Sequence, residues 1–589
     1  MKKKVMPVII IIALILIIGL IYGAQIAIEK FSYSKTQADL NEYYGISSEQ
    51  DVAIIYNDSV LEDKAVKKDG VYYLDYNLAK SVQGNKFYYG EADQTLFYTT
   101  PSATYTTKIG ESSWTSTNGE SGDAGYTISY VDGEKLYIAL GYLKAFTDLD
   151  YQVFASPDRI RLYAGSYEQT LAKVKKKTAV RVLGGIKSDV VSYVEGGMAV
   201  VTNQMDEWSE IITWDAHKGY VENKYLDFMG TGEVTKAAIE AENPEGLAES
   251  PIETAAGSLP APAGLKDYTT VRLDGKVNIG FHPIAGAAGN ATIDGVIAPT
   301  KSLNVLAPTW FTISDNEGTV VSYATRDYVS TAHANGMQVW GVLDNFNSGN
   351  QIDTVAILSH EASRANVISQ LIAYAQEYEI DGINADLEQI NESCGPDYLQ
   401  FMRELSVACR QNGLVFSIDD YVPMDFNDHY DLVEQGEIAD YVVIMGYDEH
   451  YGGSDEAGSV ASIGYVQGGI EKALTMVPAE KLVNAIPFYT RVWTTSGGEV
   501  SSKALHMDGA TNIINQYGME MNWDEETCQY YGEVTDSNGA LIQLWNEESR
   551  SIEVKLSVMQ AAGIAGVAEW ALGFENAEVW DVIAAYMAQ

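Results

Sequence analysis

Apolar and polar residues alternate along residues 381–388, which read Asp-Gly-Ile-Asn-Ala-Asp-Leu-Glu. In a β-strand this alternation places Asn384, Asp386 and Glu388 on one face and the apolar residues on the other. Residues 367–380 carry apolar side chains at helical spacing, and an Asp-Gly turn separates them from the alternating run. The pattern therefore predicts a helix followed by a strand that has two carboxylates on its polar face.

Apolar runs of this kind recur along residues 270–589, where they alternate with helical stretches. Near-continuous apolar strands are typical of a parallel sheet that helices cover. Eight such units in this length predict an α/β fold, a TIM (β/α)8 barrel, over residues 270–589. The predicted strands are 277–281, 303–307, 338–342, 382–387, 415–418, 441–445, 482–486 and 563–570.

Polar residues follow several of these strands, at the ends where a TIM barrel carries its chemistry. Residues two apart on a strand lie roughly 6.6 Å apart along it, so the charge of Asp386 can raise the proton affinity of Glu388 and keep an acid protonated. An isolated Asp-x-Glu triplet is more often the polar edge of a buried strand. The barrel context favours a general acid instead.

The first half of the chain has a different pattern. Residues 29–170 contain short alternating runs rich in Tyr and Thr, which predicts a β-rich or α+β stalk-like domain. Residues 175–232 contain short strands at about ten-residue spacing and close on Gly-Tyr-Val. This segment resembles the bacterial Src-homology-3-like barrels that are often attached to wall hydrolases. Residues 238–268 are rich in Pro, Glu, Ala and Gly, a composition that predicts a disordered linker.

The N-terminus combines three lysines with a long apolar run. Lys2, Lys3 and Lys4 precede an uncharged stretch that as a helix would be about 30 Å long, enough to span a bilayer. Residues 1–28 are therefore predicted to form a single-pass membrane anchor that leaves the remaining chain outside the cell. A cleaved signal peptide is the alternative, although its apolar core is usually only about 7–15 residues long.

The overall composition argues against several classes of partner and cofactor. The formal net charge is −43, from 38 Lys and Arg against 81 Asp and Glu, which argues against a nucleic-acid partner. The three cysteines are scattered and the histidines show no paired ligand spacing, so we expect neither a disulfide framework nor a metal, and no cofactor.

Three separated motifs of the predicted barrel resemble the family-18 glycoside hydrolases. The fourth strand carries the acidic run 381–388, the sixth ends in Met-Gly-Tyr447-Asp448, and the eighth ends in Glu569-Trp570. The flanking sequences, including Trp310-Phe311 and Ile-Pro-Phe-Tyr489-Thr-Arg, are most similar to the branch of spore-cortex-lytic germination glucosaminidases. Asn384 replaces the Asp of the broader family, and Leu387 replaces a usual aromatic residue.

The resemblance implies a retaining mechanism without an enzyme nucleophile. Glu388 would protonate the glycosidic oxygen while the 2-acetamido oxygen of the substrate attacks C1. Asp386 would hold the acetamido N–H, and Tyr447 would bond the acetamido oxygen. The candidate substrate-binding residues are Asn384, Asp448, Trp570, Tyr489 and Trp310. Packing is the alternative role for Trp570 and Tyr447, and an aromatic residue near a barrel rim, such as Trp310, is as often part of the core.

Two function classes follow from these residues. The first is a membrane-anchored, wall-facing hydrolase of N-acetylglucosaminyl bonds in peptidoglycan, with a chitinase or chitooligosaccharide hydrolase as the alternative within the same chemistry. The second is a non-catalytic N-acetyl-sugar-binding protein. Such proteins typically lose the acid, whereas Glu388 and Asp386 are both present.

Overall fold

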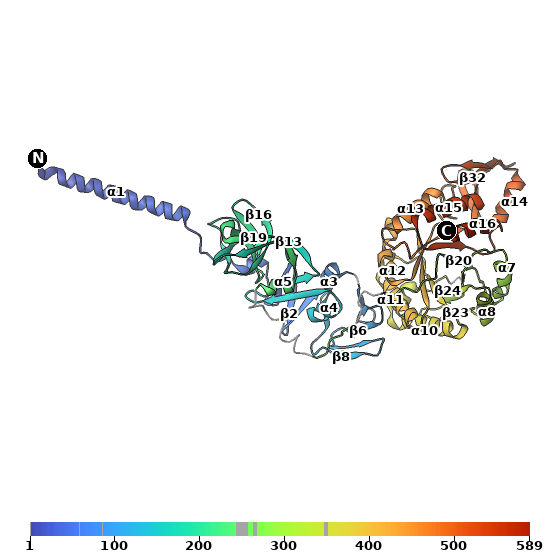
Figure 1. The fold of residues 1–589 in the computed structure, drawn as a ribbon, viewed down its shortest axis with the longest axis horizontal. Helices are drawn as coiled ribbons and strands as arrows, with labels where there is room; N and C mark the ends of the chain where they lie inside the picture. The colour runs from blue at the N-terminus through green and yellow to red at the C-terminus, as the bar shows by residue number, and fades with distance from the viewer. Residues whose placement is uncertain (1, 58, 85, 243–256, 263–267, 347–351) are drawn as a thin grey trace. The chain divides into compact units, whose positions relative to one another are not determined.

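The computed structural model describes residues 2–57, 59–84, 86–242, 257–262, 268–346 and 352–589. The chain divides into two compact units. The first contains residues 1–87, 107–115 and 121–262, and the second contains residues 88–106, 116–120 and 263–589. The elements of both units are shown in Figure 1.

The chain begins with the long helix α1 (Lys2–Phe31). Residues Met6–Phe31 have a mean hydropathy of 2.9 and an apolar stretch that is not buried, and within the described residues this is the single helix long and apolar enough to cross a membrane. The α1 helix agrees with the predicted apolar N-terminal segment and extends slightly beyond its predicted end at residue 28.

The first unit contains two seven-stranded sheets. One has the order β11-β12-β1-β2-β3-β10-β9, with helices α2 (Leu40–Tyr44), α3 (Tyr76–Gln83) and α4 (Leu140–Phe146) in the same unit. Its only parallel pair among the described strands is β1 with β12. The strands are β1 (Asp51–Tyr56), β2 (Ser59–Lys68), β3 (Val71–Asp75), β9 (Ser129–Asp132), β10 (Lys135–Ala139), β11 (Leu149–Phe154) and β12 (Arg159–Ala164).

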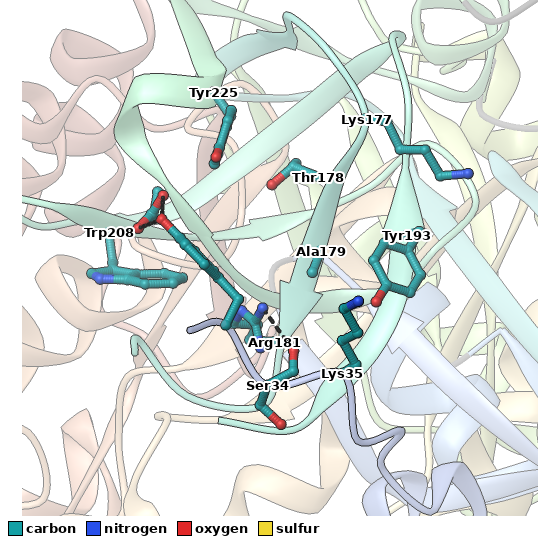
Figure 2. A pocket seen from close by; sticks show the side chains of 11 residues that line it. Ser34, Lys35, Lys177, Thr178, Ala179, Arg181, Tyr193, Trp208 and Tyr225 are labelled. Carbon is teal, nitrogen blue, oxygen red and sulfur yellow. Dashed lines mark hydrogen bonds between the residues drawn. The ribbon is translucent and has the colours of Figure 1, made fainter. Parts of the chain in front are cut away.

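The second sheet is antiparallel and has the order β15-β14-β18-β17-β16-β13-β19. It is followed by helix α5 (Lys236–Ala241). A cavity of about 270 Å³ lies between this sheet and the segment that follows α1 (Figure 2). The strands are β13 (Tyr167–Val174), β14 (Thr178–Arg181), β15 (Val190–Val194), β16 (Met198–Gln204), β17 (Trp208–Ile212), β18 (Lys218–Glu222) and β19 (Leu226–Val234).

Two boundaries differ from the sequence prediction. Strand β13 begins at Tyr167 and belongs to the second sheet, because it pairs with both β16 and β19. The predicted linker 238–268 begins inside α5, where the Thr235 side chain caps the first turn and Ile239 is buried. Residues 243–256 and 263–267 of that linker lie outside the described residues. The resemblance of residues 175–232 to Src-homology-3-like barrels stays a prediction.

The second unit is built on a closed barrel of eight parallel strands, each of which pairs with its two neighbours. All eight predicted strands are confirmed. Helices surround the barrel strands (Figure 1). In chain order the strands are β20 (Val277–His282), β21 (Val305–Pro308), β24 (Gln338–Asp344), β25 (Gly382–Asp386), β26 (Val415–Tyr421), β27 (Tyr441–Met445), β28 (Leu482–Pro487) and β34 (Gly566–Trp570).

Alternate residues of these strands form two separate cores. Ile279, Trp340 and Val443 belong to the cluster inside the barrel, whereas Ile383, Ile418 and Val567 pack in the cluster that includes the surrounding helices. This period of two is the physical basis of the apolar runs, because both faces of each strand are buried. The surrounding helices include α8 (Arg326–Ala334), α9 (Thr354–Ser359), α10 (Glu361–Tyr378), α11 (Gly395–Gln411), α12 (Leu432–Ile438), α13 (Ile463–Ala473), α15 (Ser549–Ala562) and α16 (Val579–Met587).

Between β28 and α15 the chain adds a second sheet that the sequence analysis did not predict. Its order is β30-β29-β33-β32-β31, and helix α14 (Met507–Tyr517) lies within the same insertion. The strands are β29 (Tyr489–Ser496), β30 (Glu499–His506), β31 (Asn522–Asp524), β32 (Gln529–Thr535) and β33 (Leu541–Asn546).

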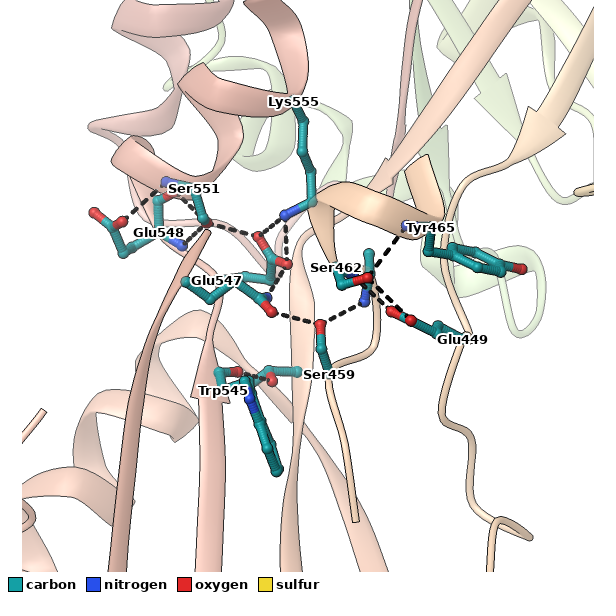
Figure 3. Close-up of polar contacts among 12 residues, drawn as sticks. Glu449, Ser459, Ser462, Tyr465, Trp545, Glu547, Glu548, Ser551 and Lys555 are labelled. Carbon is teal, nitrogen blue, oxygen red and sulfur yellow. Dashed lines mark hydrogen bonds and ion pairs between the residues drawn. The ribbon is translucent and has the colours of Figure 1, made fainter. Parts of the chain in front are cut away.

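A buried polar network connects this insertion to the barrel helices (Figure 3). The Lys555 ammonium on α15 lies 2.9 Å from Oε1 of Glu547, and both side chains are almost fully buried. The Ser551 hydroxyl donates a 2.7 Å hydrogen bond to the same carboxylate, and Gln529 on β32 donates another. The network therefore holds the end of β33 against α15.

Candidate active site

A cavity of about 400 Å³ lies at the carboxyl ends of the barrel strands. It is lined by side chains from strands β20, β24, β25, β26, β27, β29 and β34 and from the segments that follow β20, β21, β24, β25 and β27. The lining residues are Phe281, Pro283, Thr309, Asp344, Phe346, Asp386, Glu388, Asp419, Tyr421, Met445, Tyr447, Asp448, Tyr489 and Trp570. The structure therefore brings six of the eight predicted site residues to one cavity: Glu388, Asp386, Tyr447, Asp448, Tyr489 and Trp570.

Glu388 is held in this cavity from two sides. The Tyr421 hydroxyl on β26 donates a 2.7 Å hydrogen bond to its Oε2 atom. The Asn345 side chain forms two hydrogen bonds with the backbone of Glu388. The Asn345 amide donates to the Glu388 carbonyl at 2.8 Å, and the Glu388 N–H donates to the Asn345 side-chain oxygen at 3.0 Å. The carboxylate is therefore positioned without an ion pair to any described residue, which leaves it free to exchange a proton with a ligand.

Three further carboxyl groups lie around Glu388 on adjacent strands. Asp386 precedes it on β25, Asp344 pairs in register with Asp386 on β24, and Asp419 lies on the next strand, β26. Oδ1 of Asp386 is buried and has no hydrogen-bond partner in the described part of the chain. A buried, unpartnered carboxyl oxygen in a cavity is suited to accept a hydrogen bond from a ligand.

This crowding of acids affects their protonation. Burial, followed by the charges of Asp419, Glu388 and Asp344, holds the pKa of Asp386 well above its usual range. Burial also raises the pKa of Asp344 to about 6 and that of Asp419 to about 8. The cluster therefore retains protons near neutral pH, since several like charges cannot all ionise in one desolvated site.

Burial raises the pKa of Glu388 as well, and the charge of Asp448 acts in the same direction. The hydrogen bond from Tyr421 lowers this pKa, because it stabilises the ionised carboxylate. An acid whose pKa is raised by a desolvated site can donate a proton near neutral pH. Glu388 thus has both the position and the electrostatic environment of a general acid.

Asn384 shares the polar face of β25 but is buried below the cavity and does not line it. Its amide donates hydrogen bonds of 2.8 Å to Asp419 Oδ1 and 3.0 Å to the Ser417 hydroxyl. Asn384 therefore orients Asp419 on the next strand. The spacing of residues along one strand does not reveal a contact of this kind between strands.

Tyr447 lies beside the acids, and its ring packs edge-on against that of Tyr489, with centroids 6.1 Å apart. Burial, followed by the charges of Tyr489 and Asp419, keeps the pKa of Tyr447 well above its usual range. Its hydroxyl therefore stays protonated and available as a donor. The Tyr489 hydroxyl donates a 2.5 Å hydrogen bond to Asp448, a residue whose φ of 60° is left-handed.

Trp570 ends β34 and forms an aromatic wall of the cavity together with Phe281, with ring centroids 5.8 Å apart. Trp310 does not reach the cavity. It is fully buried, its Nε1–H donates a 2.7 Å hydrogen bond to Asn290, and its ring packs on Tyr328. The structure thus places Trp570 where a ligand can contact it and places Trp310 in the core between sheet and helices.

Sequence reasoning placed polar residues at the ends of several strands but missed Tyr421 as a site residue. The alternation along β26 contained the signal, since Asp419 and Tyr421 are two residues apart and share a face. Among the residues that the structure describes, no group of three or more His, Cys, Asp or Glu side chains is arranged to hold a metal ion.

Comparison with known proteins finds similarity over the barrel. Residues 307–575 match the profile of Glycosyl hydrolases family 18. The chain is 25% identical to the uncharacterized glycosylase YvbX of Bacillus subtilis over 291 residues, which cover 48% of this chain and 84% of that protein. It is 27% identical to the cortical fragment-lytic enzyme of Bacillus subtilis over 234 residues, which cover 38% of this chain and 54% of that protein.

Two further proteins are similar to this chain. The chain is 25% identical to di-N-acetylchitobiase of Rattus norvegicus over 237 residues, which cover 35% of this chain and 64% of that protein. Among solved structures, the Bacillus cereus spore cortex-lytic enzyme SleL aligns with 55% of this chain and 76% of its own, at 22% identity and a TM-score of 0.48. The chain spans about half the length of the cortical fragment-lytic enzymes it matches.

Proposed function

We propose that this chain, whose C-terminal barrel is a family 18 glycoside hydrolase domain, cleaves β-1,4 bonds of N-acetylglucosamine-containing cell-wall glycan with Glu388 as the general acid. One observation carries the proposal. Asp386 at the end of β25 and Glu388 two residues beyond it line the same cavity, and their surroundings raise the pKa of both carboxyls. An acid that retains its proton beside an acceptor without a partner fits hydrolysis of an N-acetylated sugar.

The proposed reaction proceeds in two steps. In the first, Glu388 donates its proton to the glycosidic oxygen, the bond from that oxygen to C1 breaks, and the 2-acetamido oxygen of the same sugar bonds to C1. The product is an oxazolinium ion that stays next to the ionised Glu388. In the second step water attacks C1, Glu388 takes the proton of that water, and the acetamido group is restored. The Tyr421 hydroxyl stabilises the ionised Glu388 between the two steps.

Asp386 and Tyr447 have complementary roles in this proposal. The free Oδ1 of Asp386 accepts the hydrogen bond of the acetamido N–H, which holds the acetamido oxygen near C1. The protonated hydroxyl of Tyr447 donates to that oxygen before attack. Trp570 and Phe281 offer an apolar wall for the face of the pyranose ring.

The class of glycan is inferred from two features. Similarity to cortical fragment-lytic enzymes favours peptidoglycan, and the helix α1 favours a place at the outer face of a membrane, next to a wall. The lysines at residues 2–4 would stay on the cytoplasmic side, so both units would face outward. A cleaved signal segment is the competing assignment for α1.

A chitinase or chitooligosaccharide hydrolase is the second candidate, because the barrel is also similar to di-N-acetylchitobiase and would perform the same chemistry. A non-catalytic N-acetyl-sugar-binding protein is the third. The presence of Glu388 in an acid-retaining site argues against it.

The deciding experiment is mass analysis of the products released from purified peptidoglycan and from chitin, side by side, by the wild type and by Glu388→Gln. Release of muropeptides with reducing N-acetylglucosamine by the wild type, lost by a factor of about 100 to 10,000 in the variant, is expected. Full activity of Glu388→Gln would refute the mechanism. Cleavage of chitin alone would favour the second candidate, and binding without any cleavage would favour the third.

A further inference from the structure

The cavity between the segment that follows α1 and the second sheet of the first unit carries a further inference. We name it the juxtahelical pocket, and its lining residues are Tyr33, Ser34, Lys35, Lys177, Thr178, Ala179, Arg181, Tyr193, Trp208, Glu222 and Tyr225. Figure 2 shows side chains from the segment after α1 and from the strands of the sheet around one hollow. The pocket belongs to the first unit and contains none of the residues of the barrel site.

The segment after α1 is attached to the sheet, so this pocket is a built feature. The Ser34 N–H donates a 2.7 Å hydrogen bond to the carbonyl of Ile186, and the Arg181 guanidinium donates to the Ser34 carbonyl at 3.1 Å. Further along, the Ala38 N–H donates to the Val190 carbonyl at 2.9 Å. The chain that leaves α1 therefore forms one wall of the pocket.

The pocket is cationic although the whole chain carries a net charge of −43. Lys35, Lys177 and Arg181 line it against a single acid, Glu222. Glu222 is already satisfied, because it accepts a 2.9 Å hydrogen bond from the Tyr33 hydroxyl and pairs with Lys224. Acids more than about 8–10 Å away are screened at physiological salt, so the local charges decide what binds here.

The three cations have no acidic partner among the described residues. Arg181 is buried and donates only to backbone carbonyls, those of Ser188 and Ser34. Lys35 and Lys177 are exposed and form no ion pair in the described part of the chain. Three unneutralised positive charges in one hollow favour an anionic ligand.

Aromatic rings complete the pocket. Tyr33 is 41% exposed and Tyr193 is 48% exposed, and the Arg181 guanidinium lies 5.6 Å from the centre of the Tyr33 ring. Trp208 is half-buried on β17. Exposed Tyr and partly exposed Trp side chains beside Lys and Arg form the composition that membrane proteins place at the level of the lipid headgroups.

The position of the pocket along the chain agrees with this composition. Helix α1 has 30 residues and is therefore about 45 Å long, against a bilayer of about 40–45 Å including its headgroups. Tyr33 follows the last residue of α1, Phe31, by only two positions, a span of at most about 7 Å. If α1 crosses the membrane, the pocket opens where the headgroups end.

We propose that the juxtahelical pocket binds the phosphodiester headgroup of an anionic phospholipid in the outer leaflet. Lys35 and Lys177 would neutralise the phosphate, and the buried Arg181 would add a third positive charge. The exposed rings of Tyr33 and Tyr193 would lie among the headgroups. The bound lipid would fix the orientation of the first unit on the membrane. This inference rests on the proposed membrane anchor and is independent of the glycan on which the barrel acts.

The test uses the full chain in vesicles of phosphatidylcholine with one quarter phosphatidylglycerol. After flotation through alkaline carbonate, the protein is extracted in mild detergent and the retained lipids are quantified by headgroup. We expect the wild type to retain phosphatidylglycerol above its bulk share. Lys35→Gln/Lys177→Gln should lower the affinity for phosphatidylglycerol by about 25-fold, since each cation near an anionic surface contributes about fivefold, and should return the retained share to the bulk share. Lys35→Arg/Lys177→Arg should preserve it.

A matched control removes two lysines elsewhere, Lys135→Gln/Lys503→Gln, both of which are exposed and outside the pocket. Equal enrichment in the pocket variant and this control would overturn the proposal, as would displacement of the lipid by millimolar inorganic phosphate at constant ionic strength. Failure of the wild type to float would refute the anchor and this inference with it, while cleavage of soluble chitooligosaccharide would still report on the barrel. All variants should retain that cleavage if they are folded.

Discussion

The Tyr421 hydroxyl on β26 donates a 2.7 Å hydrogen bond to Oε2 of Glu388, the acid two residues beyond the end of the neighbouring strand β25. The same hydroxyl accepts a 3.2 Å hydrogen bond from the N–H of Gln389. Tyr421 is therefore linked both to the acid and to the backbone that follows it. It fixes the direction of Glu388 and, by stabilising the carboxylate, moderates the rise in the pKa of that residue.

Removing this hydroxyl tests the proposed role of Glu388. In Tyr421→Phe the ionised Glu388 loses a hydrogen bond, so the pKa of Glu388 should rise further. The alkaline limb of kcat/KM, where the general acid loses its proton, should then move to higher pH by about one unit. The measurement is the pH profile of kcat/KM on a soluble chitooligosaccharide. A limb that stays in place or moves to lower pH would show that Glu388 is not the acid whose ionisation limits the rate.

The buried carboxyl groups of the barrel strands should make the free energy of unfolding depend on pH in a defined direction. The pKa values of Asp344, Asp420 and Asp419 are raised to about 6, 7 and 8 in the folded chain, mainly by burial. A group whose pKa is raised on folding stabilises the fold below its unfolded pKa, about 3.9 for Asp, and this stabilisation is lost as the pH rises through the folded value. The free energy of unfolding should therefore fall between about pH 4 and pH 8.

Asp419→Asn removes one of these protons and keeps an oxygen that can accept the hydrogen bond from Asn384. The thermal unfolding midpoint should then depend less on pH between about 4 and 8, since each retained proton contributes up to about 1.4 kcal/mol per pH unit. The exposed Asp508→Asn serves as the control and should leave the slope unchanged. An unchanged slope in Asp419→Asn would contradict the raised pKa of that residue.

Two tryptophans that the sequence treated alike should respond differently to mutation. Trp570 lines the cavity, so Trp570→Ala should lower kcat/KM by about tenfold or more through lost contact with the sugar. Trp310 is buried away from it, so Trp310→Phe should lower the unfolding midpoint while kcat/KM changes by less than about twofold. Steady-state kinetics and calorimetry on both variants check this. A large loss of kcat/KM in a folded Trp310→Phe variant would instead indicate that Trp310 contacts the substrate.

The buried pair of Lys555 and Glu547 gives a stability prediction that is independent of catalysis. Lys555→Met leaves the Glu547 carboxylate buried without its cation, so the free energy of unfolding should fall by about 3–5 kcal/mol. The double variant Lys555→Met/Glu547→Gln should recover much of that loss, because the uncompensated charge is gone. Denaturant unfolding of the wild type and both variants measures the effect. Equal stability of Lys555→Met and the wild type would contradict the buried contact.

Much of the barrel could be predicted because each strand is buried on both faces. All eight strands and the shared face of Asp386 and Glu388 follow from a period of two that local covalent geometry imposes, since successive side chains of a strand point to opposite sides. The insertion that contains β29 to β33 could not be separated from the barrel in this way. Its short strands show no regular alternation with helices, and the pairing of β29 with β33 joins segments far apart in the sequence.

The sequence by itself determined the fold class of residues 270–589, the acidic face of β25 and the apolar length of α1, because these depend on the spacing of residues along one segment. Only the tertiary structure decided that Tyr421 touches Glu388, that Asn384 bonds to Asp419, and that Trp310 is buried while Trp570 lines the cavity. These relationships run across strands. They depend on the register of neighbouring strands and on the packing of the helices outside the barrel, which no periodicity within a single segment specifies.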